Sequence, residues 1–145
     1  MKEIKTEILI HAGPQKVWAI LMDFQKYPGW NPFIRSLTGT VAVGNRITVR
    51  LEPPGAKGMT FQPRVLALEQ QKELRWLGKV LFRGLFDGEH KFELADNGNG
   101  TTTFRQSETF KGILVPLFRK MLDINTPDGF RLMNRKLKER AEQKD

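Results

Sequence analysis

The sequence predicts an α+β fold in which a curved sheet wraps round a C-terminal helix, with room for an apolar ligand between them. Three observations predict it. An opening strand is followed at once by a short amphipathic helix, the stretch from Phe33 to Gly112 contains only strand and turn signals, and the chain closes with helix. Neighbouring strands joined by such short turns are expected to pair antiparallel.

The first strand is expected at Ile4–His11, where apolar residues alternate with mostly polar ones. Gly13-Pro14 ends this strand, and proline suits the first position of a helix. Apolar residues spaced by three and four then predict a helix that reaches Phe24. The aromatic, proline-rich segment Tyr27–Pro32 cannot continue that helix and is expected to be a loop or short turn.

Clear turn signals separate the strands expected in this region. The strongest hairpin signal is Asp96–Gly100, which is made of Asp, Asn and Gly residues. The expected strands are one that ends near Val43, then Arg46–Leu51, Met59–Leu68, Leu74–Phe82, Glu89–Leu94 and Thr101–Phe110.

The C-terminal part is expected to be helical. Leu114–Leu122 is typical of a short helix or a lead-in to one, and Thr126 with Pro127 marks a helix start, with threonine as the N-cap. The last helix should bury a stripe made of Phe130, Met133, Leu137 and Ala141. Residues 1–145 contain no repeat or linker and are expected to form a single ligand-binding domain.

Composition excludes several kinds of protein. The 145 residues include no cysteine, which excludes a disulfide scaffold, a Cys-based zinc site and thiol catalysis. The N-terminus alternates charged and apolar residues, unlike a signal peptide, and the longest apolar-rich run, Gly112–Leu122, is too short to span a bilayer. A cytoplasmic protein is expected.

The net charge of +8 suggests anionic partners. Its densest cluster, between Arg131 and Arg140, is expected to be the solvated face of the last helix, so nucleic acid is not an expected partner. The segment 113–122 carries an apolar face flanked by cations and is a candidate for peripheral contact with a membrane. The protein is expected to be a monomer or a weak dimer.

A set of short motifs runs in a consistent order along essentially the whole chain. They are Val17-Trp18 with Asp23-Phe24, the run Tyr27–Phe33, Leu74-Arg75-Trp76 followed by Gly78, the strand His90–Leu94, Gly100-Thr101-Thr102 leading to Glu108 and Gly112, and Phe130 with Met133-Asn134 and Leu137-Lys138. Together they resemble the START-like or Bet v 1-like (SRPBCC) superfamily, and within it the polyketide cyclase/dehydrase and lipid-transport group.

The resemblance implies a helix-grip fold. In that fold a curved antiparallel sheet of six or seven strands wraps round a long C-terminal helix, short helices follow the first strand, and a cavity lies between sheet and helix. It implies activity less specifically, because carriers, cyclases, hydrolases and regulators share this scaffold.

Strand parity selects the candidate catalytic residues. Phe104 and Phe110 share one face of the last strand, so that face should point inward and bring Glu108 with it. The same reasoning places His90 inside. A buried carboxylate could act as general acid or base, or could simply bond a backbone group. A lone histidine on an apolar strand face is more often a hydrogen-bonded core residue than a catalytic one.

The ligand-binding candidates are the remaining inward or rim positions. They are Trp30, Asn31, Phe33, Phe61, Trp76, Phe82, Phe104, Gln106, Phe110, Phe118, Met121, Phe130 and Met133. Two histidines without spaced acidic partners make no metal motif, and no phosphate cradle is indicated, so neither metal nor cofactor is expected.

Three functions stay open. The first is a carrier or sensor that encloses a lipid, an isoprenoid or an aromatic polyketide-like compound in the cavity. The second is a cyclase or dehydratase that uses Glu108 or His90 for proton transfer. The third is a partner-binding module that acts through the basic C-terminal helix.

Overall fold

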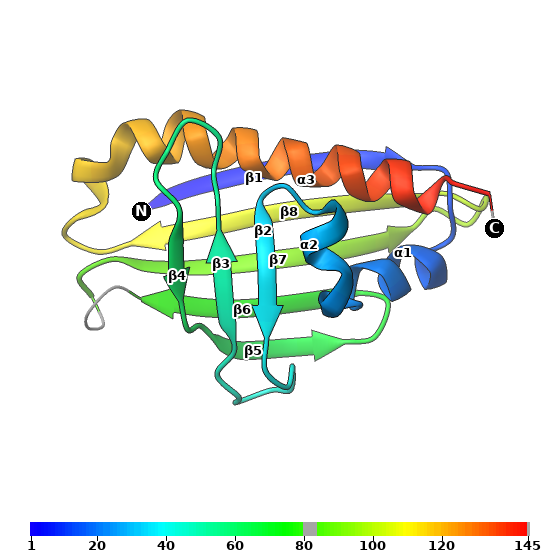
Figure 1. Cartoon of the computed structure of the whole chain (residues 1–145), viewed down its shortest axis with the longest axis horizontal. Coiled ribbons are helices and arrows are strands. Elements are labelled where there is room, and N and C mark those ends of the chain that lie inside the picture. The colour runs from blue at the N-terminus through cyan, green and yellow to red at the C-terminus, as the bar shows by residue number, and fades with distance from the viewer. Residues whose placement is uncertain (80–83, 145) are drawn as a thin grey trace.

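The computed structural model describes residues 1–79 and 84–144 and has the α+β architecture that the sequence predicts (Figure 1). A five-stranded antiparallel sheet in the order β1-β8-β7-β6-β5 forms one wall. Its strands are β1 (Lys2–Ile10), β5 (Arg64–Glu69), β6 (Glu73–Lys79), β7 (Asp87–Asp96) and β8 (Thr102–Lys111). The predicted hairpin at Asp96–Gly100 joins β7 to β8.

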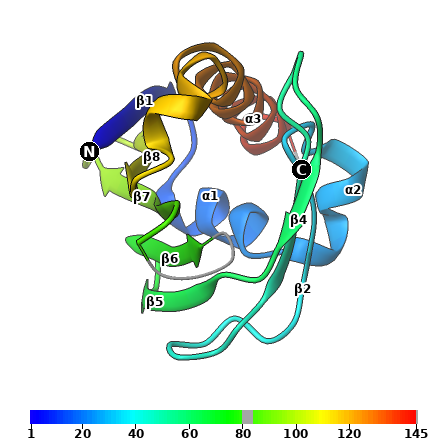
Figure 2. The same ribbon diagram turned by 90° about the vertical axis from the view of Figure 1, so that its left-hand side faces the viewer.

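A second, three-stranded sheet in the order β2-β3-β4 faces the first. It consists of β2 (Ile34–Thr38), β3 (Thr48–Leu51) and β4 (Met59–Phe61). Viewed from one end, the two sheets and the C-terminal helix surround a common interior (Figure 2). A backbone hydrogen bond from Gly44 to Val65 ties the loop between β2 and β3 to β5, and a second one from Ile47 reaches Pro63, just before that strand.

The strand predicted at Met59–Leu68 is two strands in different sheets. β4 ends at Phe61 and β5 begins at Arg64, with Pro63 between them. Proline has no backbone N–H and therefore cannot continue a strand ladder, so the chain changes sheet at this point. The described strands thus number eight in two sheets, where the sequence suggested six or seven in one.

The helices after β1 are α1 (Pro14–Leu21), η1 (Phe24–Lys26) and α2 (Tyr27–Trp30). The segment Tyr27–Pro32, predicted as a loop or short turn, therefore begins with a helical turn. Pro28 is tolerated because it lies in the first turn, where backbone N–H groups have no helical partner. The turn ends when the Asn31 backbone N–H donates to the Tyr27 carbonyl at 2.8 Å.

The C-terminal helix α3 (Thr126–Ala141) follows a 3₁₀ turn η2 (Val115–Phe118) and a π-helical turn η3 (Met121–Asn125). The prediction that Thr126 caps the helix is wrong, because Asn125 and Thr126 are both already helical, with φ and ψ near −67°, −43° and −71°, −46°. The predicted stripe from Phe130 to Ala141 is buried, as expected.

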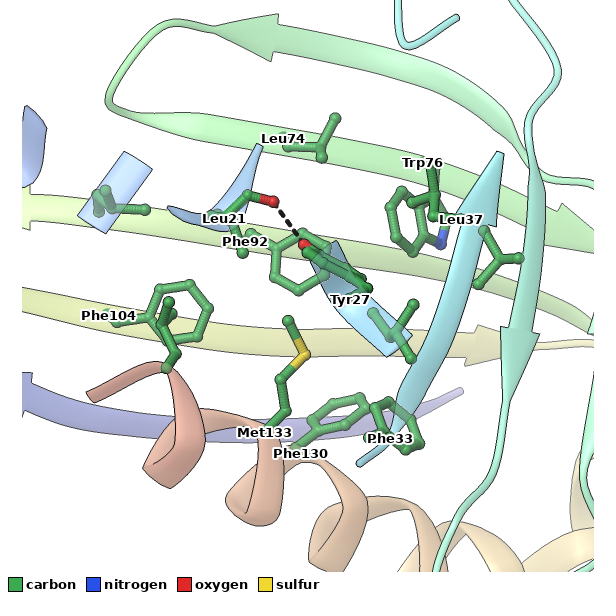
Figure 3. Close-up of a cluster of buried hydrophobic side chains, with 14 of the residues drawn as sticks. Leu21, Tyr27, Phe33, Leu37, Leu74, Trp76, Phe92, Phe104, Phe130 and Met133 are labelled. Atoms are coloured by element: carbon green, nitrogen blue, oxygen red, sulfur yellow. Dashed lines mark hydrogen bonds between the residues drawn. The ribbon is translucent and has the colours of Figure 1, made fainter. Parts of the chain in front are cut away.

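The core lies between the large sheet, α2, β2 and α3 (Figure 3). Its largest fully buried side chains include Trp76, Tyr27, Phe33, Phe92, Phe104 and Phe130. Burial of each large apolar side chain contributes about 1.5–3 kcal/mol. The predicted strand faces are confirmed: His90 and Phe92 of β7, and Phe104 and Gln106 of β8, are all buried.

Candidate functional site

An apolar pocket lies between the two sheets at the N-terminal end of the helical segment η3–α3. It is lined by Phe33, Leu51, Pro53, Met59, Phe61, Gly78, Lys79, Phe86, Gly88, Glu108, Phe110, Met121 and Thr126. The space available to water-sized molecules is about 60 Å³. Since one water needs roughly 10–15 Å³ of such space, the pocket has room for a handful of waters.

Two glycines make the wall of this pocket. Gly78 of β6 and Gly88 of β7 are directly paired across the strands. A Cβ on Gly78 would lie 2.8 Å from the Phe61 ring, and a Cβ on Gly88 would lie 2.4 Å from Glu108 Oε2. The missing side chains therefore leave the space that the Phe61 ring and the Glu108 carboxylate occupy.

Glu108 brings a carboxylate to this otherwise mostly apolar lining. It pairs with His90 across β7 and β8, and the His90 Nδ1 lies 3.0 Å from Glu108 Oε1. The Glu108 side chain is 12% exposed, whereas that of His90 is 2% exposed. The histidine is therefore reached from the pocket by way of the carboxylate.

A chain of hydrogen bonds continues behind His90. The His90 Nε2 lies 3.0 Å from Gln106 Oε1, and the Gln106 amide donates to Asn134 Oδ1 on α3 at 2.9 Å. The Asn134 amide in turn donates to the Thr6 hydroxyl, which donates to the Gln106 backbone carbonyl. Because the Thr6 hydroxyl gives its only proton to the Gln106 carbonyl, it must accept from Asn134, and this fixes the direction of each bond in the chain.

These bond directions assign the tautomer of the histidine. The Gln106 Nε2 donates to Asn134, so the atom of Gln106 that faces His90 is its Oε1, which can only accept a hydrogen bond. The His90 Nε2 must therefore carry the proton of this bond. The remaining proton lies between His90 Nδ1 and Glu108. The pair is either a neutral imidazole with a carboxylic acid or an imidazolium with a carboxylate, and converting one form into the other moves one proton.

Aromatic rings hold the imidazole in place. The Trp76 ring stacks on it with centroids 5.2 Å apart, and the Phe130 ring meets it edge-on at 5.0 Å. Phe92 lies beside it at 4.5 Å. With both ring nitrogens hydrogen-bonded and three aromatic rings packed against it, the imidazole is held in place, and Glu108 is the one hydrogen-bonded partner that can exchange a proton with it.

Most of the predicted site residues fall into two groups, one in the pocket lining and one in the core. Phe33, Phe61, Glu108, Phe110 and Met121 lie together in the pocket lining. Phe118 contacts the lining residue Phe86, with ring centroids 5.0 Å apart. His90, Trp76, Phe104, Gln106, Phe130 and Met133 lie in the core behind the lining. Phe82 lies outside the described residues.

Trp30 and Asn31 lie in the α2 region and do not line the pocket. Asn31 is fully buried, and its Oδ1 accepts from the backbone N–H groups of Phe33 and Ile34 at 3.0 and 2.9 Å. This side chain fixes the path of the backbone from α2 into β2. Trp30 is half-buried, and its indole ring meets the Tyr27 ring edge-on at 5.3 Å.

Sequence reasoning missed Leu51, Met59, Phe86 and the glycine pair Gly78 and Gly88. Met59 stands two residues before Phe61 in the same strand, so strand parity could have placed it on the pocket face. Glycines inside a predicted strand often mark a close approach of another group. That signal was present at Gly78, but its pairing with Gly88 was not visible.

Within residues 1–79 and 84–144, no three His, Cys, Asp or Glu side chains gather as metal ligands. In the same residues no helix has the length and the apolar character needed to cross a membrane.

A comparison with protein-family models gives one match over nearly the whole chain. The model describes polyketide cyclases, dehydrases and lipid-transport proteins, and residues 1–142 match it. A comparison with curated proteins found no match.

Solved structures show the same fold at low sequence identity. The ZhuI aromatase/cyclase from Streptomyces sp. R1128 superposes with a TM-score of 0.78 at 12% identity, covering 97% of this chain and 93% of that one. A START superfamily protein from Mycobacterium smegmatis has a TM-score of 0.71 at 19% identity, covering 97% of both chains. Norcoclaurine synthase from Thalictrum flavum has a TM-score of 0.72 at 11% identity, covering 97% of this chain and 93% of that one.

Proposed function

This chain belongs to the polyketide cyclase/dehydrase and lipid-transport family, and from that premise we propose that it binds a hydrophobic small molecule in the pocket beside Glu108. The observation that carries the proposal is the lining itself. Leu51, Met59, Phe61, Phe86 and Phe110 offer apolar surface, and one carboxylate is available to orient a polar end of the ligand. An apolar pocket with few polar groups is the usual form of a small-molecule site.

The ligand class follows from the lining and the size of the pocket. Aromatic rings and thioethers favour flat aromatic or branched hydrocarbon groups over sugars or nucleotides. A drug-sized ligand needs roughly 300 Å³ or more, which exceeds the present space. The flexible, half-buried side chains of Met59 and Met121 at the lining must therefore turn away when a lipid, isoprenoid or polyketide-like compound enters.

The test is the content of the natively purified protein. Liquid chromatography and mass spectrometry of an organic extract should detect an apolar compound at close to one per chain. A Met59→Glu variant should lose it, because a carboxylate would then replace apolar lining. Leu68→Glu, an exposed leucine on β5, is the matched control and should keep the compound.

Two outcomes would contradict the binding proposal. One is an empty extract together with no binding of an apolar dye such as anilinonaphthalene sulfonate. The other is equal content in the Met59→Glu and Leu68→Glu proteins. Trp76 is unsuitable for this test, because it is buried in the core and its replacement by a charged residue would damage the fold.

The Glu108–His90 pair favours a second candidate, an enzyme of the cyclase or dehydratase type. Glu108 faces the pocket and shares a proton with a fixed imidazole, which is what a general acid or base requires. The carboxylate would take a proton from a carbon next to a carbonyl group of the ligand. It would return that proton to a departing hydroxyl group, which leaves as water.

Isotope exchange tests this candidate without knowledge of the product. The ligand extracted from the protein is returned to fresh protein in D₂O, and its deuterium content is followed by mass spectrometry. An enzyme should incorporate deuterium at the acidic position, and Glu108→Gln should abolish incorporation while keeping the ligand bound. Equal exchange in the wild type and Glu108→Gln would exclude Glu108 as the base.

A further inference from the structure

Apolar side chains project into solvent from the segment between β8 and α3. Ile113 is 77% exposed and Leu117 is 76% exposed, and Phe118 and Ile124 are also exposed. We call these four residues the apolar face. Clustered exposed apolar groups usually mark an interaction surface, since isolated ones are common but groups of this kind are not.

Exposed cations flank this face. Lys111 stands just before the segment, and Arg119 and Lys120 follow Phe118 directly. None of these three makes a salt bridge within the described part of the chain. The nearby Asp123 is neutralised by Lys2. The face therefore combines apolar groups with uncompensated positive charge.

The face is continuous with the pocket. The Phe118 ring contacts Phe86, which lines the pocket, and Met121 of the same segment lines it directly. Backbone hydrogen bonds from Ile113 and Leu114 to the carbonyls of Gly84 and Leu85 hold the segment beside the start of β7. A surface that covers the apolar face would therefore also lie against the pocket.

We propose that the apolar face docks on an anionic lipid bilayer. Aliphatic and aromatic side chains that enter the acyl boundary, with lysine and arginine at headgroup level, are the features of interfacial membrane binding. Leu117 and Phe118 project from the 3₁₀ turn η2, Ile124 projects from the π-helical turn η3, and Ile113 precedes both. The proposal does not depend on whether the pocket holds a ligand.

The cations of α3 differ from those that flank the apolar face, because several of them are paired with carboxylates. Arg131 is paired with Asp128, Lys136 with Glu139, and Lys138 with Glu142. The positive charge on that helix is therefore partly neutralised within the helix itself. This contrast supplies a matched control, because equal numbers of charges can be reversed on the two surfaces.

Vesicle flotation tests the proposal with pure lipids. The wild type should float with phosphatidylcholine vesicles that contain about 30% phosphatidylserine at about 0.1 M salt, where the Debye length is about 10 Å. It should float poorly with phosphatidylcholine alone, and about 1 M salt should release it. Failure to float with anionic vesicles would overturn the proposal.

Two pairs of variants locate the contact. Ile113→Asp with Leu117→Asp should lower vesicle affinity about tenfold or more, and Leu9→Asp with Val43→Asp, at exposed apolar positions elsewhere, should not. Arg119→Glu with Lys120→Glu should also weaken binding, and Arg135→Glu with Lys136→Glu should have little effect. A loss confined to the α3 variant would overturn the proposal and assign the contact to α3.

The absence of cysteine allows a direct readout of insertion. A Leu117→Cys protein labelled with an environment-sensitive dye such as NBD carries a single probe. Its emission should shift to the blue and rise when anionic vesicles are added, whereas the same dye at Val43→Cys should not respond. If the dye at position 117 does not respond to vesicles, or responds only to a protein partner, the proposal that this face binds a bilayer is wrong.

Discussion

His90 and Glu108 face each other across adjacent strands, with Nδ1 and Oε1 3.0 Å apart, and one of them is sealed in the core while the other reaches the pocket. The relationship depends on strand register, because the two residues are direct partners in the β7–β8 ladder. It gives the pocket a carboxylate whose proton is shared with a fixed imidazole.

The state of His90 can be measured by NMR. The hydrogen-bond chain through Gln106 and Asn134 requires a proton on His90 Nε2. Long-range ¹H–¹⁵N spectra should show a protonated Nε2 in the wild type. In Glu108→Gln the amide can donate to Nδ1, so the ring should be a neutral Nε2–H tautomer.

The exposed His11, the only other histidine, is an internal reference for that spectrum. A His90 that carries its proton on Nδ1 and none on Nε2 would refute the orientation of the whole network.

Gly88→Ala should disturb the carboxylate. The new Cβ would lie 2.4 Å from Glu108 Oε2, so the carboxylate that bonds His90 through Oε1 must shift. We expect a loss of about 1–3 kcal/mol in the free energy of unfolding, measured by urea denaturation. The loss should be smaller when Gly88→Ala is made in a Glu108→Ala background, because the clashing oxygen is gone. Equal losses in the two backgrounds would argue against this coupling.

Gly129→Ala should destabilise the junction of α3 with Phe33. A Cβ at this position would lie 2.4 Å from the buried Phe33 ring, which already packs edge-on against Phe130 at 5.4 Å. Overpacking of this kind costs about 1–3 kcal/mol. Thermal and urea unfolding of the variant would measure it.

Gly29→Ala is the matched control. Gly29 is also helical, in α2, but no atom lies within 4 Å of its Cβ position. Alanine should there be neutral or stabilise by up to about 1 kcal/mol, because it limits the freedom of the unfolded chain. Similar changes in the free energy of unfolding for Gly129→Ala and Gly29→Ala would show that the space around the new Cβ does not determine its effect.

Tyr27 should make stability fall at alkaline pH. Burial raises the pKa of its phenol well above the usual range, and the nearby Asp23 charge adds to the effect. The folded pKa lies above the unfolded value of about 10, so the contribution is full below pH 10 and is lost as pH rises above it. Phenolate absorbance of this single tyrosine should therefore appear together with unfolding.

Tyr27→Phe separates that contribution from the titration of lysines. The phenol donates to the Leu21 carbonyl at 2.5 Å (Figure 3), and its removal leaves a buried acceptor unpaired. We expect a loss of about 1–3 kcal/mol at neutral pH and a weaker fall of stability above pH 10. An unchanged alkaline slope in the variant would exclude Tyr27 as its cause.

Much of the fold could be predicted because the relevant signals are local. Period-two alternation placed His90, Phe92, Phe104 and Gln106 inside, and helical spacing placed the stripe of α3. The errors in the predicted elements occur where tertiary packing overrides the local sequence preference. Pro63 divided one predicted strand between two sheets, and the π-helical turn before Thr126 removed the predicted cap.

The pocket depended on information that is not local. Gly78 and Gly88 are ten positions apart in sequence and become a wall only when β6 and β7 pair in this register. The chain from His90 to Asn134 and Thr6 needs α3 to approach both β1 and β8. A single sequence carries the residues but not the pairing that brings them together.

The sequence by itself determined the overall order of strands and helices, the inward faces of β7 and β8, and the inward direction of Glu108 and His90, because side-chain alternation follows from backbone geometry. Only the tertiary structure decided which apolar residues line the pocket and which fill the core, and that Glu108 faces the pocket while His90 lies behind it. Those outcomes depend on register and on the approach of α3, which are set by packing among segments far apart in the chain.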